Sequence, residues 1–285
     1  MSKLKIAIQK SGRLNQDSLK LLKDCGISVE NGIDQLKVSV GNFPMEILYL
    51  RNSDIPQYVE DGVVDIAIIG ENLLIERQNK VEIVQQLGFS KCKVSLAIPK
   101  EVKDESLTYF NGKKIATSYP NTLQAFLDKN NSNAEIHTIS GSVEIAPNIG
   151  LSDGICDIVS TGSTLFKNGL KETQVILKSE AVWIKSSQLT SEQEQILDKL
   201  LFRIQAVLRA KNTKYILMNV PNDKIKEVSS ILPVLKSPTI LPLAEAGWSS
   251  LHSVIDEDKF WNVIDALKNA GAEGILIVPV DKMVL

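Results

Sequence analysis

Asp153-Gly-Ile-Cys-Asp157-Ile-Val-Ser-Thr161-Gly162-Ser163-Thr164-Leu165 is the stretch that decides the fold. It predicts a short strand over residues 157–160, then a turn of Ser, Thr and Gly, then the start of a helix. Such a turn directs backbone N–H groups and hydroxyls to one point at the positive end of a helix dipole, where a phosphate monoester can bind. Gly162 lets the backbone approach such a ligand closely. Turns of this composition more often only cap a helix, so both interpretations stay open.

Two carboxylates flank this turn in the sequence, Asp153 and Asp157. They would repel a simple anion. Beside a sugar phosphate, however, they can accept hydrogen bonds from two ribose hydroxyls or help to hold Mg²⁺. Ordinary surface acids are the alternative. The combination of turn and acids favours a ribose phosphate over a free anion as the ligand.

Strands and helices alternate along most of the chain. Strands are predicted at residues 4–8, 36–40, 45–50, 64–69, 94–98, 114–118, 135–139 and 157–160, and helices at 17–25, 55–61, 71–78 and 122–129. This order predicts an α/β fold with helices covering parallel sheets. Breaks near residues 88–92 and 179–182 are expected to divide this part into two lobes. One strand over 173–184 is expected to cross back to the first lobe.

The pattern changes after the clearest predicted helix. Apolar residues at positions 196, 197, 200, 201, 204, 207 and 208 share one face of that helix, and Ser191 with Glu194 predicts a capping box at its start. Beyond it, strands are predicted at residues 215–220, 234–241, 248–255 and 274–280, and helices at 223–231 and 258–269. The order β-α-β-β-α-β is that of ferredoxin-like domains, so residues 212–285 are expected to form an appended module.

The composition and charge of the chain argue against several classes of binding partner. The chain has 285 residues and a net charge of −2, with basic residues scattered along its length, which argues against nucleic acid or an acidic membrane as a partner. No apolar run approaches the roughly 20 residues of a membrane helix, so a soluble, cytoplasmic protein is expected. Three cysteines and two histidines at these spacings assemble no zinc site.

Further loops follow predicted strands, and open α/β sheets bind their ligands there. Lys10, Gly12 and Arg13 follow the first strand, and the two cations could contact phosphates. Taken alone, a solvated basic turn is the commoner interpretation. Arg51 and Glu71 open loops after two other strands, and Glu71 suits a helix start without any ligand.

The second lobe contributes two weaker candidates. Tyr119 ends a predicted strand and could stack on a base, although core packing is commoner. Glu144 belongs to the Ser-Gly-Ser-Val-Glu segment at 140–144, which is more often a capping box than a site. His137 and His252 have no paired nucleophile or acid at a familiar spacing, and nucleophile-elbow, Walker and Rossmann patterns are missing from the sequence. Covalent-nucleophile and nicotinamide chemistry are therefore disfavoured, whereas a two-lobed binding protein without chemistry remains an alternative.

Taken together, these loops resemble the long form of the ATP phosphoribosyltransferase family. The resemblance is carried by residues 8–14 (Ile-Gln-Lys-Ser-Gly-Arg-Leu), 65–72 (Asp-Ile-Ala-Ile-Ile-Gly-Glu-Asn), 116–120, 140–147, 150–165, 168–170, 237–239 and 271–272. It runs in order through essentially the whole chain. The family joins ATP, through N1 of its adenine, to the ribose C1 of phosphoribosyl pyrophosphate (PRPP) and releases pyrophosphate, which is the first step of histidine biosynthesis.

The resemblance implies an architecture and partners. It implies two lobes like those of periplasmic binding proteins, with residues 1–91 and 181–211 in lobe I and residues 92–180 in lobe II. Residues 212–285 would be a ferredoxin-like domain that binds histidine as a feedback inhibitor. It further implies dependence on Mg²⁺, dimers that assemble into hexamers, and inhibition by AMP.

The resemblance also implies roles for individual residues. PRPP would be bound by Asp153, Asp157, Ser160, Thr161, Gly162, Ser163 and Thr164; ATP and pyrophosphate would be bound by Lys10, Gly12, Arg13, Arg51, Glu71 and Tyr119, with Glu144 at the rim. Mg²⁺ would be carried mainly by the substrate phosphates, with Asp157 as a possible protein ligand. Histidine would be bound near Asn219, Ser237, Thr239 and Ala272, although an acid would suit the amino group better than Asn219 does.

Overall fold

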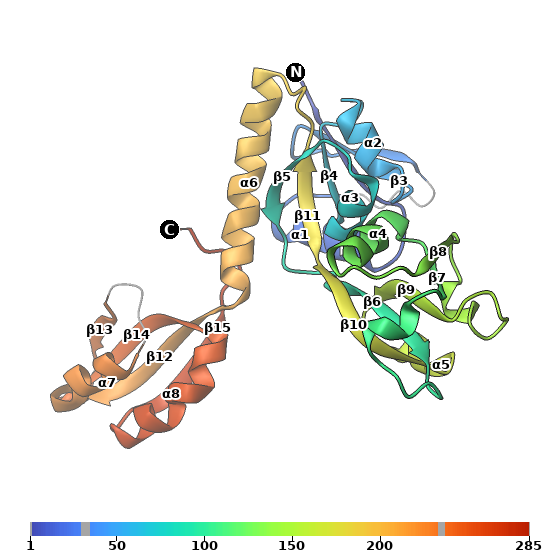
Figure 1. Cartoon of the computed structure of the whole chain (residues 1–285). Helices are drawn as coiled ribbons and strands as arrows, with labels where there is room; N and C mark the ends of the chain where they lie inside the picture. The colour runs from blue at the N-terminus through green and yellow to red at the C-terminus, as the bar shows by residue number, and fades with distance from the viewer. Residues whose placement is uncertain (1, 30–34, 233–236, 285) are drawn as a thin grey trace. The chain divides into compact units, whose positions relative to one another are not determined.

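The computed structural model describes residues 2–29, 35–232 and 237–284. The chain forms two compact units, Met1–Lys23 with Ile27–Leu197, and Asp24–Gly26 with Asp198–Leu285. Figure 1 shows the elements of each unit. None of the helices in the described ranges has both the length and the apolar character that a membrane span requires.

The first sheet of the larger unit has six strands in the order β2-β3-β1-β4-β11-β5. Their bounds are β1 Leu4–Gln9, β2 Lys37–Ser39, β3 Met45–Leu50, β4 Ile66–Gly70, β5 Glu82–Gln86 and β11 Ala181–Lys185. Helices α1 (Arg13–Asp24), α2 (Ile55–Glu60) and α3 (Glu71–Arg77) follow β1, β3 and β4. Since β1 runs parallel to both β3 and β4, the loops that open these three helices lie at one edge of the sheet.

The second sheet has five strands in the order β10-β6-β9-β7-β8. Their bounds are β6 Cys92–Pro99, β7 Lys114–Thr117, β8 Glu135–Thr138, β9 Gly154–Val159 and β10 Leu170–Ser179, with α4 Pro120–Lys129, α5 Ser163–Lys167 and the short 3-10 helices η1 Leu107–Phe110 and η2 Val143–Ile145. Strand β9 begins at Gly154, three residues before the predicted start, because Ile155 and Cys156 are fully buried and belong to the sheet. Strands β7, β8 and β9 are parallel, so their carboxyl ends also share an edge.

The chain passes between these two sheets at two neighbouring places. The strand predicted over 173–184 is in fact two strands, because β10 belongs to the second sheet and β11 to the first, with Glu180 between them. The other passage, after β5, lies beside it: Leu87 N donates to Ala181 O at 3.0 Å, and Ala181 N donates to Phe89 O at 3.0 Å. Both predicted breaks therefore mark real changes of sheet.

Helix α6 (Ser191–Lys211) begins with a capping box one residue earlier than predicted. Thr190 N donates to Gln193 Oε1 at 3.0 Å, and Gln193 N donates to Thr190 Oγ1 at 3.3 Å. The predicted pair Ser191 and Glu194 is wrong, because Ser191 is already helical and the capping side chain must precede the first turn.

The smaller unit contains a four-stranded antiparallel sheet in the order β13-β14-β12-β15. Its elements are β12 Thr213–Pro221, η3 Asn222–Lys224, α7 Ile225–Ile231, β13 Thr239–Pro242, β14 Trp248–Asp256, α8 Glu257–Asn269 and β15 Glu273–Pro279. This order confirms the predicted β-α-β-β-α-β module; of the strand predicted at 234–241, residues 234–236 lie outside the described part.

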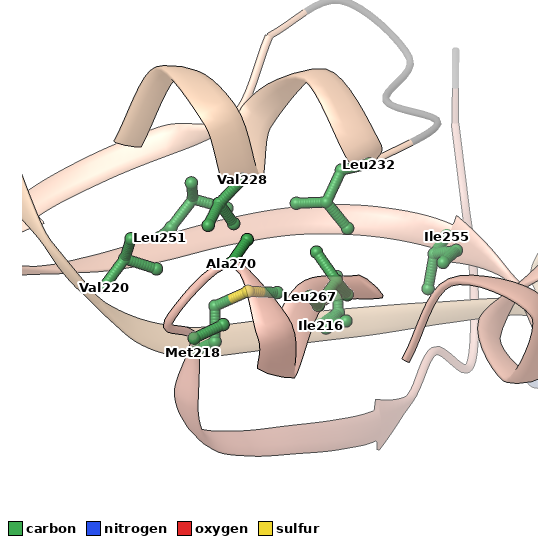
Figure 2. Close-up of a cluster of buried hydrophobic side chains, with 10 residues drawn as sticks. Ile216, Met218, Val220, Val228, Leu232, Leu251, Ile255, Leu267 and Ala270 are labelled. Carbon is green, nitrogen blue, oxygen red and sulfur yellow. The ribbon is translucent and has the colours of Figure 1, made fainter. Parts of the chain in front are cut away.

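One face of this small sheet carries its core. Every second residue of β12, namely Ile216, Met218 and Val220, is fully buried against Val228 of α7 and Leu267 of α8 (Figure 2). Burial of an aliphatic side chain contributes about 1.5–3 kcal/mol, so this alternation fixes which face the helices cover. The residues between them, including Asn219, project from the opposite face.

Candidate functional site

The first sheet gathers three predicted residues at one edge. Lys10 and Arg51 directly follow β1 and β3, whose last residues are paired in parallel, and Lys10 N donates to Leu50 O at 2.9 Å. Glu71 directly follows β4, the neighbour of β1 on the other side. The two cations are exposed and Glu71 is half-buried. Loops that are distant in sequence therefore present two positive charges and one carboxylate side by side.

The loop after β1 turns toward the passage between the sheets. Gly12 has φ +91°, a conformation that favours glycine, and lets the chain turn into α1. Arg13 Nε lies 3.8 Å from Asp17 Oδ2, which accepts a 2.8 Å hydrogen bond from Ser90 Oγ. Burial raises the pKa of the Cys92 thiol, and the charge of Arg13 acts against that rise, so Arg13 lies near the start of β6.

The second sheet brings Asp157 and Glu144 together at its carboxyl edge. Asp157 lies near the end of β9, where Ser118 Oγ donates to its Oδ1 at 3.4 Å. Burial raises the pKa of the Asp157 carboxyl, and the negative charge of Glu144 raises it further. Two carboxylates that repel each other in a half-buried position suit a ligand that offers hydroxyl donors or positive charge.

Asp153 does not belong to this group, and the prediction that it flanks the turn is wrong. It lies before β9, where its Oδ2 accepts a 2.9 Å hydrogen bond from Lys114 N at the start of β7. Its carbonyl accepts a 3.3 Å hydrogen bond from Tyr109 Oη. The whole of β9 separates it from the turn, and a strand rises about 3.3 Å per residue, so the two acids face opposite edges of the sheet.

The predicted phosphate turn is exposed. Its hydroxyl-bearing residues Ser160, Thr161, Ser163 and Thr164 all reach solvent, and the Oγ1 of Thr161 lies 3.0 Å from the Oγ of Ser163. Gly162 precedes α5 with φ +73° and has no side chain to cap the helix. The first N–H groups of a helix have no partner within it, so this turn suits an external acceptor.

A cavity of about 480 Å³ lies where the turn meets the passage between the sheets. Its lining consists of Glu71, Gln86, Lys91, Cys92, Lys93, Val159, Ser160, Lys178, Ser179 and Glu180. Ser160 and Glu71 were predicted as site residues from separate loops, and the cavity brings them together. Residues 161–164 continue from Ser160 but do not line it.

The sequence did not single out the lysines of this cavity. Lys91, Lys93 and Lys178 lie on or beside β6 and β10, and isolated lysines on strands carry no sequence signal of a site. Lys93 Nζ contacts Glu172 Oε2 at 2.6 Å, and Lys91 Nζ lies 4.0 Å from Glu180 Oε2. Only the antiparallel pairing of β6 with β10 reveals that these positive charges share one cavity with Ser160.

Tyr119 is held between the two lobes. Its hydroxyl accepts a 3.0 Å hydrogen bond from Asn72 Nδ2 of α3, and its ring packs against the core of the second sheet. Burial raises the pKa of this phenol, so it stays protonated at neutral pH. Asn72 follows Glu71 directly and could have been found from that proximity.

The four residues predicted to bind histidine lie in the smaller unit but not on one face. Asn219 and Thr239 are exposed on the sheet face away from the helices, where Thr239 pairs with His252 and Asn219 with Ser250. Ser237 is exposed before β13. Ala272 instead packs into the helix-side core with 5% of its surface exposed, so its side chain does not face Asn219.

Asp157 and Glu144 are the candidate protein ligands for a metal ion. Among the described residues, no group of three or more His, Cys, Asp or Glu side chains is arranged to hold a metal ion. Asp157 and Glu144 supply carboxylate oxygens, which Mg²⁺ prefers, and this ion usually completes its shell with water and substrate phosphates. The donor set therefore fits Mg²⁺ that arrives with a phosphorylated substrate.

Comparison with known proteins gives consistent matches along the chain. A family model described as ATP phosphoribosyltransferase matches residues 51–206, and one described as HisG, C-terminal domain, matches residues 210–282. An ATP phosphoribosyltransferase of Cytophaga hutchinsonii is 56% identical over 281 residues, covering 99% of this chain and 98% of that protein. One of Bacteroides fragilis is 51% identical and covers 99% of this chain and 100% of its own.

Solved structures show similar folds. The ATP phosphoribosyl transferase (HisG:HisZ) complex from Thermotoga maritima contains a chain with 29% identity and a TM-score of 0.59, over 71% of this chain and 98% of that one. A putative periplasmic sulfonate-binding protein of Methylobacillus flagellatus matches with a TM-score of 0.50 and 15% identity, over 72% of this chain and 67% of that one. The second likeness concerns the fold alone and agrees with the expected two-lobed architecture.

Proposed function

The chain belongs to the ATP phosphoribosyltransferase family, and from this premise we propose that it transfers the phosphoribosyl group of PRPP to N1 of the adenine of ATP, releasing pyrophosphate in the first step of histidine biosynthesis. The observation that carries the proposed site is that Ser160, the first residue of the phosphate turn, lines one cavity with Glu71 of the opposite lobe. Two substrates held by different lobes can meet there.

The 5-phosphate of PRPP is bound by the turn of residues 160–164. Two helices of lobe II begin at this edge, and their N-termini differ. At α4, the N–H groups of Asn121 and Thr122 already donate to the carboxylate of Glu76. At α5, Gly162 offers no capping oxygen, and the hydroxyls of Thr161 and Ser163 flank the same point. The α5 terminus is therefore the better phosphate site.

The ribose of PRPP lies beside Asp157 and Glu144. Ionised carboxylates accept hydrogen bonds from the ribose hydroxyls. As pyrophosphate leaves, C1 gains positive charge like that of an oxocarbenium ion, and nearby carboxylates stabilise it. Burial raises the pKa of Asp157, and repulsion from Glu144 adds to that rise; this repulsion is relieved in the same step. The second carboxylate beside the ribose is therefore Glu144, and not Asp153 as the sequence had suggested.

ATP and the leaving pyrophosphate lie on the side of lobe I. Lys10, Gly12, Arg13, Arg51 and Glu71 gather at or near the edge of the first sheet, and Tyr119 faces them from lobe II. Lys91, Lys93 and Lys178 add positive charge in the cavity, which suits polyphosphate. The adenine N1 is a free nucleophile, so positioning and electrostatics can supply catalysis without a strong general base.

Mg²⁺ is proposed as the cofactor, carried mainly by the substrate phosphates. When bound, it would neutralise charge that develops on the departing pyrophosphate. Asp157 and Glu144 are the carboxylates of the proposed PRPP site that would contact it or its water shell. The chain's own part is to orient the phosphates with its lysines and hydroxyls.

Regulation and assembly are proposed on the resemblance. Histidine binds the ferredoxin-like module near Asn219, Ser237 and Thr239, and AMP competes in the cleft. The chain forms dimers that assemble into hexamers. The domain limits 1–91 with 181–211, 92–180 and 212–285 are proposed as well. The membership of the strands in three sheets supports them, although residues 198–211 of α6 group with the smaller compact unit.

A direct assay tests the activity. Purified protein is mixed with ATP, PRPP and Mg²⁺, and pyrophosphate release is followed together with the change in adenine absorbance. Both signals should appear only when all three components are present. Binding of PRPP without either signal would instead support a two-lobed binding protein.

A further inference from the structure

The contact between α3 of lobe I and α4 of lobe II is built around one buried carboxylate. Glu76, on α3, is 6% exposed. Its Oε1 accepts a 3.0 Å hydrogen bond from Asn121 N, and its Oε2 accepts bonds from Thr122 N at 2.9 Å and Thr122 Oγ1 at 2.7 Å. Its backbone oxygen accepts a further bond from Asn121 Nδ2 at 2.9 Å. One side chain of lobe I thus binds the first turn of a helix in lobe II.

This arrangement supplies a cap that α4 lacks locally. The residue before the helix is Tyr119, whose side chain makes no cap, and Pro120 at the first position has no N–H. The next two N–H groups need an acceptor, and Glu76, more than forty positions earlier in the chain, provides it. A carboxylate at the positive end of a helix is favoured by the helix dipole as well as by the hydrogen bonds.

Asn72 extends the contact by one helical turn. It precedes Glu76 by four residues, so the two side chains share one face of α3. Asn72 Nδ2 donates to Tyr119 Oη at 3.0 Å, and Asn72 N donates to Ser179 Oγ at 2.9 Å. Ser179 Oγ in turn donates to Asn72 Oδ1 at 3.0 Å. The same face of α3 therefore holds both α4 and the end of β10.

Two strand passages alone would leave the lobes free to hinge. They lie next to each other at residues 87–91 and at Glu180, as a hinge requires. The α3–α4 contact is a further point of attachment, and it includes the buried, hydrogen-bonded side chains of Asn72, Glu76 and Thr122. It therefore constrains the opening between Glu71 of lobe I and the phosphate turn of lobe II.

We propose that Glu76 is a positioning residue that attaches α4 to α3 through its hydrogen bonds. This attachment holds the two lobes at the separation that phosphoribosyl transfer needs. Glu76 is not among the residues that line the cavity with Ser160, so its effect passes through the attachment of the lobes. The inference rests on the proposed function, since it assumes that PRPP and ATP are held by different lobes. Alignment of two reactants contributes to rate more than to the binding of either one.

The test uses Glu76→Gln in the full-length protein. The amide has nearly the same size, but it removes the charge and replaces one acceptor oxygen by a donor that faces other donors. Hydrogen exchange at the backbone N–H groups of Asn121 and Thr122 should accelerate roughly tenfold to a hundredfold, as expected for loss of a hydrogen bond to a charged acceptor. This readout requires no activity, so it fails or succeeds independently of the proposed function.

The kinetic readout separates alignment from general damage. In Glu76→Gln, kcat should fall about tenfold, while the dissociation constant of ribose 5-phosphate changes less than about twofold, because the residues proposed to bind the ribose and the 5-phosphate lie within lobe II. Glu76→Asp keeps the charge and should restore part of kcat. Asp128→Asn on the exposed part of α4 makes the same chemical change away from the contact, where the Asp128 side chain accepts a hydrogen bond from Gln124, and it should leave exchange and kcat unchanged.

Defined results overturn the proposal. Unchanged exchange at Asn121 and Thr122 would show that Glu76 does not cap α4 in solution. Faster exchange with unchanged kcat, or equal weakening of ribose 5-phosphate binding and kcat, would show that the contact does not position the lobes. If Glu76→Gln does not fold, Thr122→Val removes only the 2.7 Å bond, and kcat should then fall about threefold. An unchanged kcat in that variant also overturns the proposal.

Discussion

Asn72 in the first lobe donates a 3.0 Å hydrogen bond to the hydroxyl of Tyr119 in the second lobe. The two residues follow strands β4 and β7 of different sheets, so their contact joins the carboxyl edges of both sheets. This contact brings together loops that were individually weak candidates, and it supports the proposal that they form one site.

Asp157 and Glu144 should give kcat/KM for PRPP a defined pH dependence. Burial, and then the charge of Glu144, raise the pKa of Asp157. We propose that its ionised form accepts hydrogen bonds from the ribose. As pH falls through this raised pKa, kcat/KM for PRPP should decline at a higher pH than for an ordinary aspartate with a pKa near 3.9. In Glu144→Gln the negative charge is gone, so the pKa of Asp157 drops and the acid limb should move to lower pH. A limb that stays in place or moves upward would show that the two groups are not coupled.

Asp153 should matter for stability and not for substrate. Asp153→Ala removes the acceptor of the Lys114 N–H group, and the free energy of unfolding should fall by about 1 kcal/mol in urea titrations. The dissociation constant of PRPP should stay within about twofold of the wild-type value, because the carboxylate faces the opposite edge of the sheet. Loss of PRPP affinity without loss of stability would show that Asp153 belongs to the substrate site after all.

Gly162 is required by its backbone conformation. A side chain would meet no atom within 4 Å there, but φ +73° strains any other residue, so Gly162→Ala should cost about 1 kcal/mol or distort the turn and weaken PRPP binding. Gly169→Ala is the matched control, since Gly169 has φ +69° and equal space but lies at the far end of α5. It should lose similar stability and keep its affinity. Calorimetric titration with PRPP measures the affinity of both variants. Equal PRPP affinities would argue against the turn of residues 160–164 as the phosphate site.

Feedback inhibition should depend on the exposed face of the small sheet. Asn219→Ala should raise the histidine concentration needed for half inhibition about tenfold or more while kcat stays unchanged, because the site and the cleft are distinct. Asn262→Ala, on the outer side of α8, replaces the same residue type and should change neither quantity. Inhibition that is equally strong in both variants would place the histidine site elsewhere.

Sequence patterns predicted most elements and left the partners of individual side chains open. The alternation of apolar residues located β1, β3 and the whole β-α-β-β-α-β module, because burial imposes those periods directly. Asp153 was misplaced because spacing in sequence does not tell that a complete strand lies between it and the turn. A break near Glu180 was predicted, but the strand predicted over 173–184 ran across it, because apolar residues lie on both sides, at 175–177 and 181–184. Glu76 and Lys178 gave no signal, since a charged side chain on a helix or strand is ordinarily solvated.

The central claim is that the turn of residues 160–164 binds the 5-phosphate of PRPP. Thr161 is exposed, so Thr161→Ala removes one hydroxyl from the turn without disturbing the core. Dissociation constants of PRPP and of ATP, measured separately by titration calorimetry, test the claim most directly. PRPP binding should weaken about tenfold while ATP binding stays within about twofold. Equal weakening of both ligands, or unchanged binding of PRPP, would contradict it.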